Sequence, residues 1–200
     1  MLKKILFIFC ASFIVIALKA QANEQDMKEY YPGFSFVKGI YMSFDEFKNN
    51  NPTYKIEFQK RGENIYIYDD SLKKDVAVNP NKVWGYSDGS NIYISQEEAF
   101  WKLITIGKLN QFTAIVITRF STVDAFGFPI DRYSKMLSQL FFDFQDGEVK
   151  RLEKSNLKPY LEAEPLLYNK IKKKLKNDAG LVLAIKSINQ LYPIYFPTHE

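Results

Sequence analysis

The chain is poor in the two side chains that carry most nucleophilic and metal chemistry, since its 200 residues include one cysteine and one histidine. His199 is the second-last residue, where we expect a frayed chain end. Ser–His–Asp and Cys–His sites therefore lack members unless the tail packs on the fold. Zinc sites of the usual kind lack ligands, and no glycine-rich phosphate loop occurs. We expect no catalytic residue of these kinds, no metal and no cofactor.

The only cysteine, Cys10, lies within residues 1–22, a segment that has the three parts of a signal peptide. Two lysines precede an apolar run over residues 5–18, and Ala20-Gln21-Ala22 supplies the small residues that signal peptidase requires. The run is short for the ~30 Å core of a bilayer. We therefore expect cleavage, no stable membrane span afterwards, and no disulfide. Cys10 follows Phe9 rather than a small residue, so we expect no lipidation.

Net charge is also scarce once the signal peptide is removed. Residues 1–22 contain three lysines and no acidic residue, so cleavage brings the formal charge from +4 close to neutral. The hypothesis of a nucleic-acid partner thereby loses its main support, which is the basic net charge. The lysine-rich segment 170–176 resembles a membrane-contacting stretch. Acidic residues flank it at Glu162, Glu164 and Asp178, which favours a solvated helix face.

Short strands separated by turn residues dominate the first three-quarters of the chain. Aromatic or β-branched residues alternate with polar ones within each strand, and the strands follow one another about every 8–12 residues. This spacing is typical of an antiparallel meander, folded here into a strongly curved sheet or a partly closed barrel. One substantial loop, residues 124–133, carries Phe126-Gly127-Phe128-Pro129. We expect strands over 34–42, 53–59, 64–70, 82–87, 91–95, 100–109, 111–120, 135–144 and 148–152.

Helical signals appear once early and then at the end. Ser43 with Glu46 three residues later predicts a short capped helix. Ser155 or Asn156 is expected to cap a helix that Pro165 splits in two, and Asn177-Asp178 caps a last helix ending near residue 191. Pro193 then stops it. The fold class is α+β: a polar leader over 23–33 precedes a single domain over 34–200, with a sheet at 34–152 and two to three helices at 155–191.

The stretch KVWGYSDGSNIYIS, residues 82–95, predicts a hairpin. Asp88-Gly89 between two β-rich runs is a strong turn signal because glycine tolerates positive φ. We expect Asp88 to be a turn former, with Trp84 and Tyr86 on one face of the strand. Gly85 leaves space for an aromatic ring over the backbone.

Three segments together resemble a known family: KGIYMSFDEFKNNNP (38–52), NKVWGYSDGSNIYIS (81–95) and the tail from SNLKPYLEAEP (155–165) to INQLYP (188–193). In this order, behind a signal peptide, they are similar to a family of uncharacterised secreted proteins of Bacteroidota. The resemblance implies export from a Gram-negative cell and an α+β fold, and it brings no assigned activity. WGYSDG also resembles one unit of the WG β-repeat, but a single copy does not support an array.

Gly39-Ile40-Tyr41 invites comparison with GIY-YIG nucleases. That family needs a second Tyr-Ile-Gly strand, and the nearest sequence here is Tyr93-Ile94-Ser95. We therefore set the nuclease interpretation aside.

Carboxylate chemistry is what remains for an enzyme. A glycosidase needs two carboxylates about 5–9 Å apart. Each candidate pair also has an ordinary interpretation as solvated strand or turn residues, which is the commoner one. The candidate pairs are Glu57 with Asp69, Asp143 with Asp146, and Asp124 with Asp131.

Aromatic residues are abundant, with 17 Phe and 13 Tyr. We expect most to form the core, namely Phe34, Phe36, Tyr54, Phe58, Phe100, Phe112, Phe141 and Phe142. Others are candidates for a lined cavity or an exposed strip. The candidate ligand-binding residues are Tyr66, Tyr68, Trp84, Tyr86, Phe126 and Phe128.

These observations favour a non-enzymatic protein of the periplasm or extracellular space that binds a small hydrophobic molecule or a protein partner. A carboxylate-based glycan hydrolase is the first alternative, and a structural envelope component is the second. A cavity lined by aromatics would favour a small ligand. Two converging carboxylates would favour the hydrolase, and a flat apolar patch would favour a structural role. A glycan or an envelope protein also remains as the bound partner.

Overall fold

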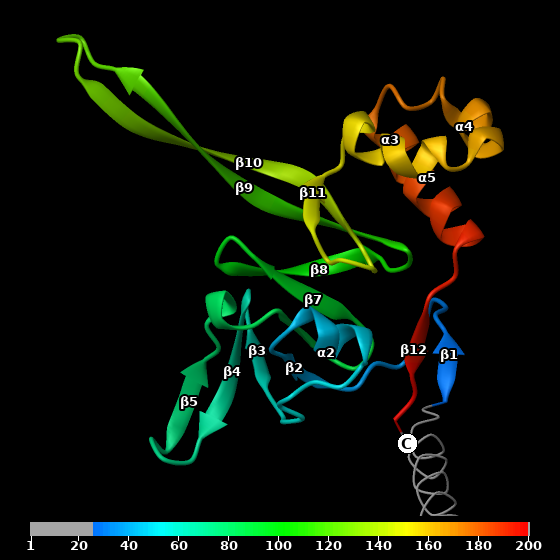
Figure 1. The fold of residues 1–200 in the computed structure, drawn as a ribbon. Coiled ribbons are helices and arrows are strands. Elements are labelled where there is room, and N and C mark those ends of the chain that lie inside the picture. The colour runs from blue at the N-terminus through cyan, green and yellow to red at the C-terminus, as the bar shows by residue number, and fades with distance from the viewer. Residues whose placement is uncertain (1–25, 200) are drawn as a thin grey trace, which may run out of the picture.

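The computed structural model of the protein describes residues 26–199, and the predicted signal peptide lies outside the described residues. A meander of antiparallel strands forms the centre, with the order β11-β10-β9-β8-β7-β6-β2 (Figure 1). Within residues 26–199 this sheet is open and not closed into a barrel. The strands are β2 (Gly39–Tyr41), β6 (Gly85–Ser87), β7 (Ile92–Gln96), β8 (Ala99–Thr105), β9 (Leu109–Val123), β10 (Pro129–Asp143) and β11 (Val149–Arg151).

A second, small sheet projects from the body at the lower left of Figure 1. It contains β3 (Gln59–Arg61), β4 (Asn64–Asp69) and β5 (Lys74–Ala77), followed by the 3-10 turn η1 (Pro80–Lys82). The strand expected over 53–59 is reduced to β3 and a single bridge between Tyr54 and Ile40. The strand expected over 34–42 is likewise reduced to β2.

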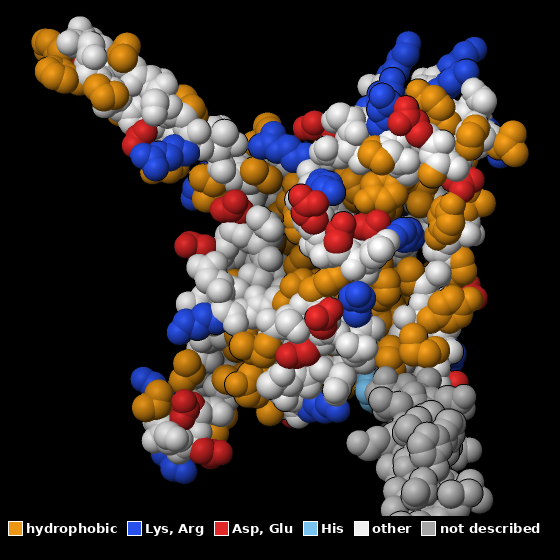
Figure 2. Space-filling model, viewed as in Figure 1, with side chains coloured by type: hydrophobic (Ala, Val, Ile, Leu, Met, Phe, Trp, Pro, Cys, Tyr) orange, Lys and Arg blue, Asp and Glu red, His pale blue; other side chains and the backbone are white. Residues whose placement is uncertain are grey.

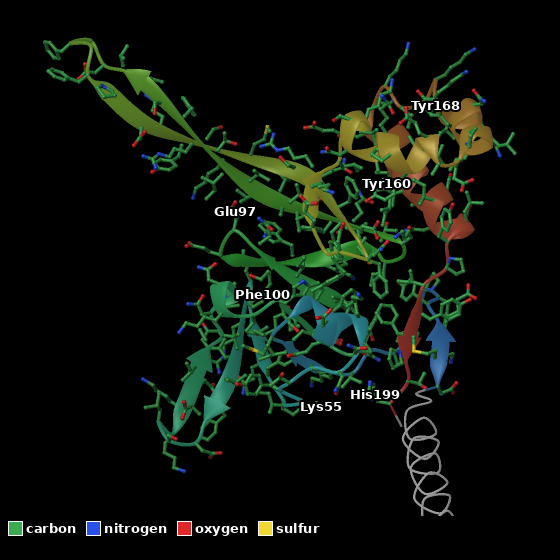
Figure 3. All side chains as sticks on the ribbon, viewed as in Figure 1. Lys55, Glu97, Phe100, Tyr160, Tyr168 and His199 are labelled. Atoms are coloured by element: carbon green, nitrogen blue, oxygen red, sulfur yellow. The ribbon has the colours of Figure 1, made fainter. Side chains whose placement is uncertain are left out.

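The two ends of the described chain pair with each other. β1 (Met27–Glu29) lies antiparallel to β12 (Tyr195–Pro197). The predictions of a polar leader and a frayed tail are therefore both corrected, since these segments form a two-stranded sheet. Phe196 anchors the tail because its side chain is fully buried in the core. Beyond it, the Thr198 N–H donates to the Asp26 carbonyl (2.8 Å). His199 Nε2 lies 3.1 Å from the Asn49 carbonyl oxygen, beside the body (Figure 3).

The helices begin and end near the predicted capping residues and prolines, with one exception. They are α2 (Phe44–Lys48), α3 (Lys154–Glu162), α4 (Pro165–Ile171) and α5 (Asp178–Leu191). Ser43 caps α2, and Asn177 caps α5 by accepting from the Gly180 N–H. The expected cap at Ser155 or Asn156 is wrong, because α3 begins earlier with Glu153 as its N-terminal flanking residue. The α+β prediction, with a meander followed by C-terminal helices, is confirmed.

The core lies on both faces of the meander, since successive strand residues point to opposite sides. Phe112 and Phe142 join an aromatic cluster that also holds Phe34, Phe36 and Phe196. Leu109 and Phe141 face the other way and pack under α3, α4 and α5. Among the eight aromatics predicted for the core, six are buried, while Phe58 is partly buried and Tyr54 is exposed. Tyr54 is exposed although its backbone bridges Ile40.

The loop expected over 124–133 is much shorter than predicted. β10 begins at Pro129, which pairs with Val123 of β9. A proline is tolerated as the first residue of a strand because its missing N–H is not needed there. The long ribbon of β9 and β10 therefore continues almost to the turn, and only residues 124–128 connect the two strands.

Candidate functional site

The WGYSDG stretch is a hairpin bend, as predicted. β6 and β7 are antiparallel partners, with Ser87 opposite Ile92. The Asp88 carboxylate accepts from the backbone N–H groups of Ser90 (3.0 Å) and Asn91 (2.7 Å), and Gly89 has φ +99°. The side chain of Asp88 thus holds the turn together.

Trp84 and Tyr86 were expected on one face of a strand, and the structure corrects this. Trp84 lies in a bend before β6 and stacks on Phe47, with ring centroids 4.7 Å apart. Tyr86 is 1% exposed and stacks on Tyr93 in a different cluster. Gly85 between them is required by neighbouring backbone rather than by a ring, because a Cβ there would lie 2.1 Å from the Tyr93 carbonyl oxygen.

The six candidate ligand-binding residues therefore lie in separate places. Trp84 and Tyr86 pack in the core, on different clusters. Tyr66 and Tyr68 lie on β4 of the small sheet, and the Arg61 guanidinium sits 4.8 Å from the centre of the Tyr66 ring. Phe126 and Phe128 lie in the β9–β10 turn, at the opposite end of the molecule from the small sheet (Figure 1). They do not form one site.

The candidate carboxylates make local contacts. Glu57 pairs with Lys38, and Asp69 accepts from the N–H groups of Ser71 and Leu72. Asp146 accepts from the Glu148 N–H in the β10–β11 connection. The remaining members are Asp124 in the β9–β10 turn, Asp131 beside Arg119, and Asp143 beside Lys108. Five of the six candidates thus have an ordinary role in a turn or a surface ion pair, whereas Asp143 is buried and is not the solvated residue expected.

A hollow of about 270 Å³ lies between the helices and the sheet, lined in part by Lys108, Asp143 and Tyr160. Lys108 Nζ contacts the Asp143 carboxylate at 2.7 Å. Burial and the negative charge of Asp143 raise the pKa of the Tyr160 phenol far above its usual range. Tyr160 reaches from α3 toward the sheet (Figure 3), with its ring 6.3 Å from that of Phe141. The hollow has one carboxylate in its lining, whereas a glycosidase uses two.

A second hollow of about 430 Å³ lies beside the paired chain ends, lined in part by Lys28, Tyr31 and His199. Phe34 and Phe36 of the aromatic core also form part of this lining, whereas Phe47, Phe112 and Phe142 are fully buried within the same cluster. Both hollows are open to the surface, and each combines charged side chains with aromatic or aliphatic ones.

The most exposed apolar surface of the described chain is the outer part of the β9–β10 ribbon, residues 115–137, which we call the arm. Between residues 26 and 199, β8 pairs with β9 only at Gln111 and Phe112, and β11 pairs with β10 only over Leu140–Phe142. The arm therefore projects as two strands alone, at the upper left of Figure 1. Its exposed apolar residues are Ile115, Ile117, Phe120, Val123, Phe126, Phe128, Ile130, Tyr133, Met136 and Leu137.

The turn at the tip of the arm points its aromatic side chains into solvent. The Asp124 carboxylate accepts from the N–H groups of Phe126 (2.8 Å) and Phe128 (2.9 Å), and Gly127 has φ +83°. The backbone N–H groups of Phe126 and Phe128 thus find their acceptor within the turn, while the two side chains are 86% and 66% exposed. Figure 2 shows hydrophobic side chains gathered at this tip and charged ones nearer the body.

Charges lie midway along the arm. Arg119 pairs with Asp131 across the two strands, and the Ser121 hydroxyl donates to the same carboxylate (3.0 Å). The Arg119 guanidinium, assisted by Ser121, holds the pKa of Asp131 below its usual range. Sequence reasoning identified Phe126 and Phe128 but missed Tyr133, Met136 and Leu137 as surface residues. The available signal was strand-like composition continuing through residues 118–123 and 129–134.

Comparisons of the chain with protein-family models, with curated proteins and with solved structures found no match. In the described part of the chain, no helix combines the length and the apolar content needed to cross a membrane.

Proposed function

We propose that this chain is an exported, non-enzymatic binding protein of a Gram-negative envelope, and that it binds a protein partner through the arm. The observation that carries the proposal is the exposed apolar surface of residues 115–137, at the tip and along both strands. Large exposed apolar side chains gathered on one projection commonly mark an interaction site.

The isolation of the arm supports the same proposal. A two-stranded ribbon is marginally stable in water on its own, because it buries little apolar area. Both edges of the arm also present unpaired backbone groups beyond the short pairings with β8 and β11, and such edges are templates for pairing with another chain. A bound partner would cover the apolar side chains, and one that added a strand at either edge would also satisfy these groups.

A protein partner fits this surface better than a small hydrophobic molecule. A pocket for such a molecule is concave and mostly apolar. The hollow near Asp143 sets an ion pair, Lys108 with Asp143, beside Ile188, and the hollow near His199 sets Lys28 beside Phe34 and Phe36, so neither is a purely apolar pocket. The arm projects from the body and exposes large apolar side chains at its tip and its base, so it suits an extended protein surface.

A photo-crosslinking amino acid at Leu137, in the cells that produce the protein naturally, tests the proposal. The matched control is Leu166 on α4, which is 88% exposed and lies away from the arm. We expect a discrete protein adduct from Leu137 at much higher yield than from Leu166. Equal yields at the two positions, or native mass spectrometry showing a bound small molecule without a protein adduct, would overturn the proposal.

A further inference from the structure

We infer that the partner is a second copy of this chain, bound arm to arm in antiparallel orientation. The inference rests on the proposed function, since it names the protein that the arm binds. It comes from the order of side chains along one face of the arm.

The strand register defines that face. Ile115, Ile117, Arg119, Ser121 and Val123 of β9 alternate to one side, and their partners across the ribbon are the odd-numbered residues of β10 from Leu137 back to Pro129. The base of the face is mainly apolar: Ile115 lies opposite Leu137, and Ile117 lies opposite the exposed Lys135. The middle is polar, with Arg119 and Ser121 beside Tyr133 and Asp131. The end toward the tip is apolar again, with Val123 beside Pro129 and the Phe126 and Phe128 turn beyond.

This order matches itself when reversed, except that Lys135 comes level with Pro129 of the second copy, where its aliphatic stem can pack while the amino group stays in solvent. In a two-fold symmetric interface, if one residue contacts another then the reciprocal contact is made as well. A two-fold axis placed between Arg119 and Ser121 sets the tip of each arm against the base of the other. Val123 then lies against Ile117 of the second copy. Arg119 lies near Asp131 of the second copy, so opposite charges meet at the centre.

A lipid bilayer accounts for the tip but not for the base. Leu137 is eight residues along β10 from Pro129, or about 26 Å at ~3.3 Å per residue. Arg119, Asp131 and Lys135 lie between the base and the tip. Charged side chains are costly inside a membrane, so a bilayer would cover Phe126 and Phe128 and leave Leu137 and Tyr133 in water. A second arm covers both ends.

The size of the face sets the strength of the interaction. Nine residues of each strand make a ribbon about 30 Å long, and two strands are roughly 10 Å wide. Such a face buries a few hundred Å² per copy, less than the ~800 Å² per partner of a standard stable interface. We therefore expect a reversible dimer that dissociates on dilution. Sedimentation velocity over a range of protein concentrations measures it directly.

Two single-cysteine variants test the orientation of the arms. The full-length chain is expressed with its own N-terminal segment and with Cys10→Ser, so that the introduced thiol is the only one. Ser121→Cys places a thiol near the proposed axis, and Ala125→Cys places one in the tip; both residues are exposed. With a short bismaleimide, we expect Ser121→Cys to form covalent dimers and Ala125→Cys to remain monomeric. Dimers from Ala125→Cys alone would mean tip-to-tip contact and would overturn the antiparallel arrangement.

A charge placed in the apolar base tests the surface itself. Leu137→Asp should weaken the dimer about tenfold or more, because the carboxylate would be buried against the tip of the other arm. Leu166→Asp on α4 is the control and should leave the dimer unchanged. If Leu137→Asp misfolds, Phe126→Ser at the tip makes the same test, because that side chain is almost fully in solvent.

The outcomes separate this inference from the proposed function. A monomer at every concentration, together with a Leu137 photo-adduct to a different protein, overturns the second copy and leaves the binding function standing. A monomer without any arm-specific adduct overturns both. Flotation with phosphatidylethanolamine–phosphatidylglycerol vesicles that is lost in Phe126→Ser, in a protein that stays monomeric, would assign the arm to lipid instead.

Discussion

The side-chain amide of Asn189 makes two hydrogen bonds to the backbone of Leu109: Oδ1 accepts from the Leu109 N–H (2.7 Å), and Nδ2 donates to the Leu109 carbonyl (2.9 Å). An amide presents the same donor and acceptor pair as a neighbouring strand would. α5 is thereby fixed to the first residue of β9, at the root of the ribbon that becomes the arm. Gly107 provides the room, since a Cβ there would lie 2.4 Å from the Asn189 amide.

Replacing Asn189 by alanine should lower the free energy of unfolding by about 1–3 kcal/mol, because a partly buried backbone N–H and carbonyl lose their partners. Urea unfolding followed by circular dichroism measures the loss. Gln190→Ala, at the exposed neighbouring position, is the control and should be close to neutral. Equal effects of the two substitutions would show that the amide contributes little to docking α5.

Trp84→Ala should cost about 3–5 kcal/mol of stability, the usual range for a large aromatic removed from a core. Its ring stacks on Phe47, which is itself fully buried. Phe126→Ala is the same kind of change at an exposed position and should leave the monomer's unfolding midpoint unchanged. A Trp84→Ala protein that melts like wild type would mean that Trp84 belongs to a binding surface.

Two glycines of the same hairpin should respond differently to alanine. At Gly85 the added Cβ meets the Tyr93 carbonyl oxygen of the neighbouring strand, so β6 and β7 must move apart at a cost of about 1–3 kcal/mol or more. At Gly89 the space is open and φ is +99°, so the cost is conformational, about 1–2 kcal/mol. Gly89→Val should be worse than Gly89→Ala, because branching at Cβ adds strain there. Thermal unfolding of the three variants orders these costs.

Alkaline pH should unfold the protein through buried tyrosines. Burial raises the pKa values of Tyr41, Tyr86 and Tyr160 far above the ordinary value of about 10. The folded state therefore keeps these protons after the unfolded state has lost them. The stabilisation is complete below about pH 10 and is lost as the pH rises toward the higher folded values. Phenolate absorbance against pH should show a late group that appears with unfolding, and Tyr41→Phe should reduce its amplitude by one tyrosine.

The ion pair of the arm should weaken in acid. Arg119 lowers the pKa of Asp131 in the folded state, so the pairing is complete above about pH 3.9, the ordinary carboxyl value, and is lost as the pH falls through the lower folded value. A carboxyl-carbon NMR titration should show Asp131 moving toward the ordinary value in Arg119→Ala. An unchanged titration in that variant would mean that Arg119 does not hold the carboxylate in solution.

The sequence by itself determined the features that depend on residues close together in the chain. Asp88 and Gly89 make their turn with atoms two and three residues away, so the hairpin could be predicted. The caps at Ser43 and Asn177 and the new helix at Pro165 are equally local. Alternating apolar residues also sufficed for the α+β class, because the period of a strand is visible without knowing its neighbours.

Only the tertiary structure decided which surfaces are covered. Phe141 and Leu137 lie on the same strand at even spacing, yet one is fully buried beneath the helices and the other is 66% exposed. The pairing of β1 with β12 likewise joins segments from opposite ends of the chain. Burial depends on which distant elements pack against a strand, and those contacts leave no trace in the local pattern. The arm is rich in apolar residues by sequence, and they are exposed because the strand pairings with β8 and β11 end at Phe112 and Leu140.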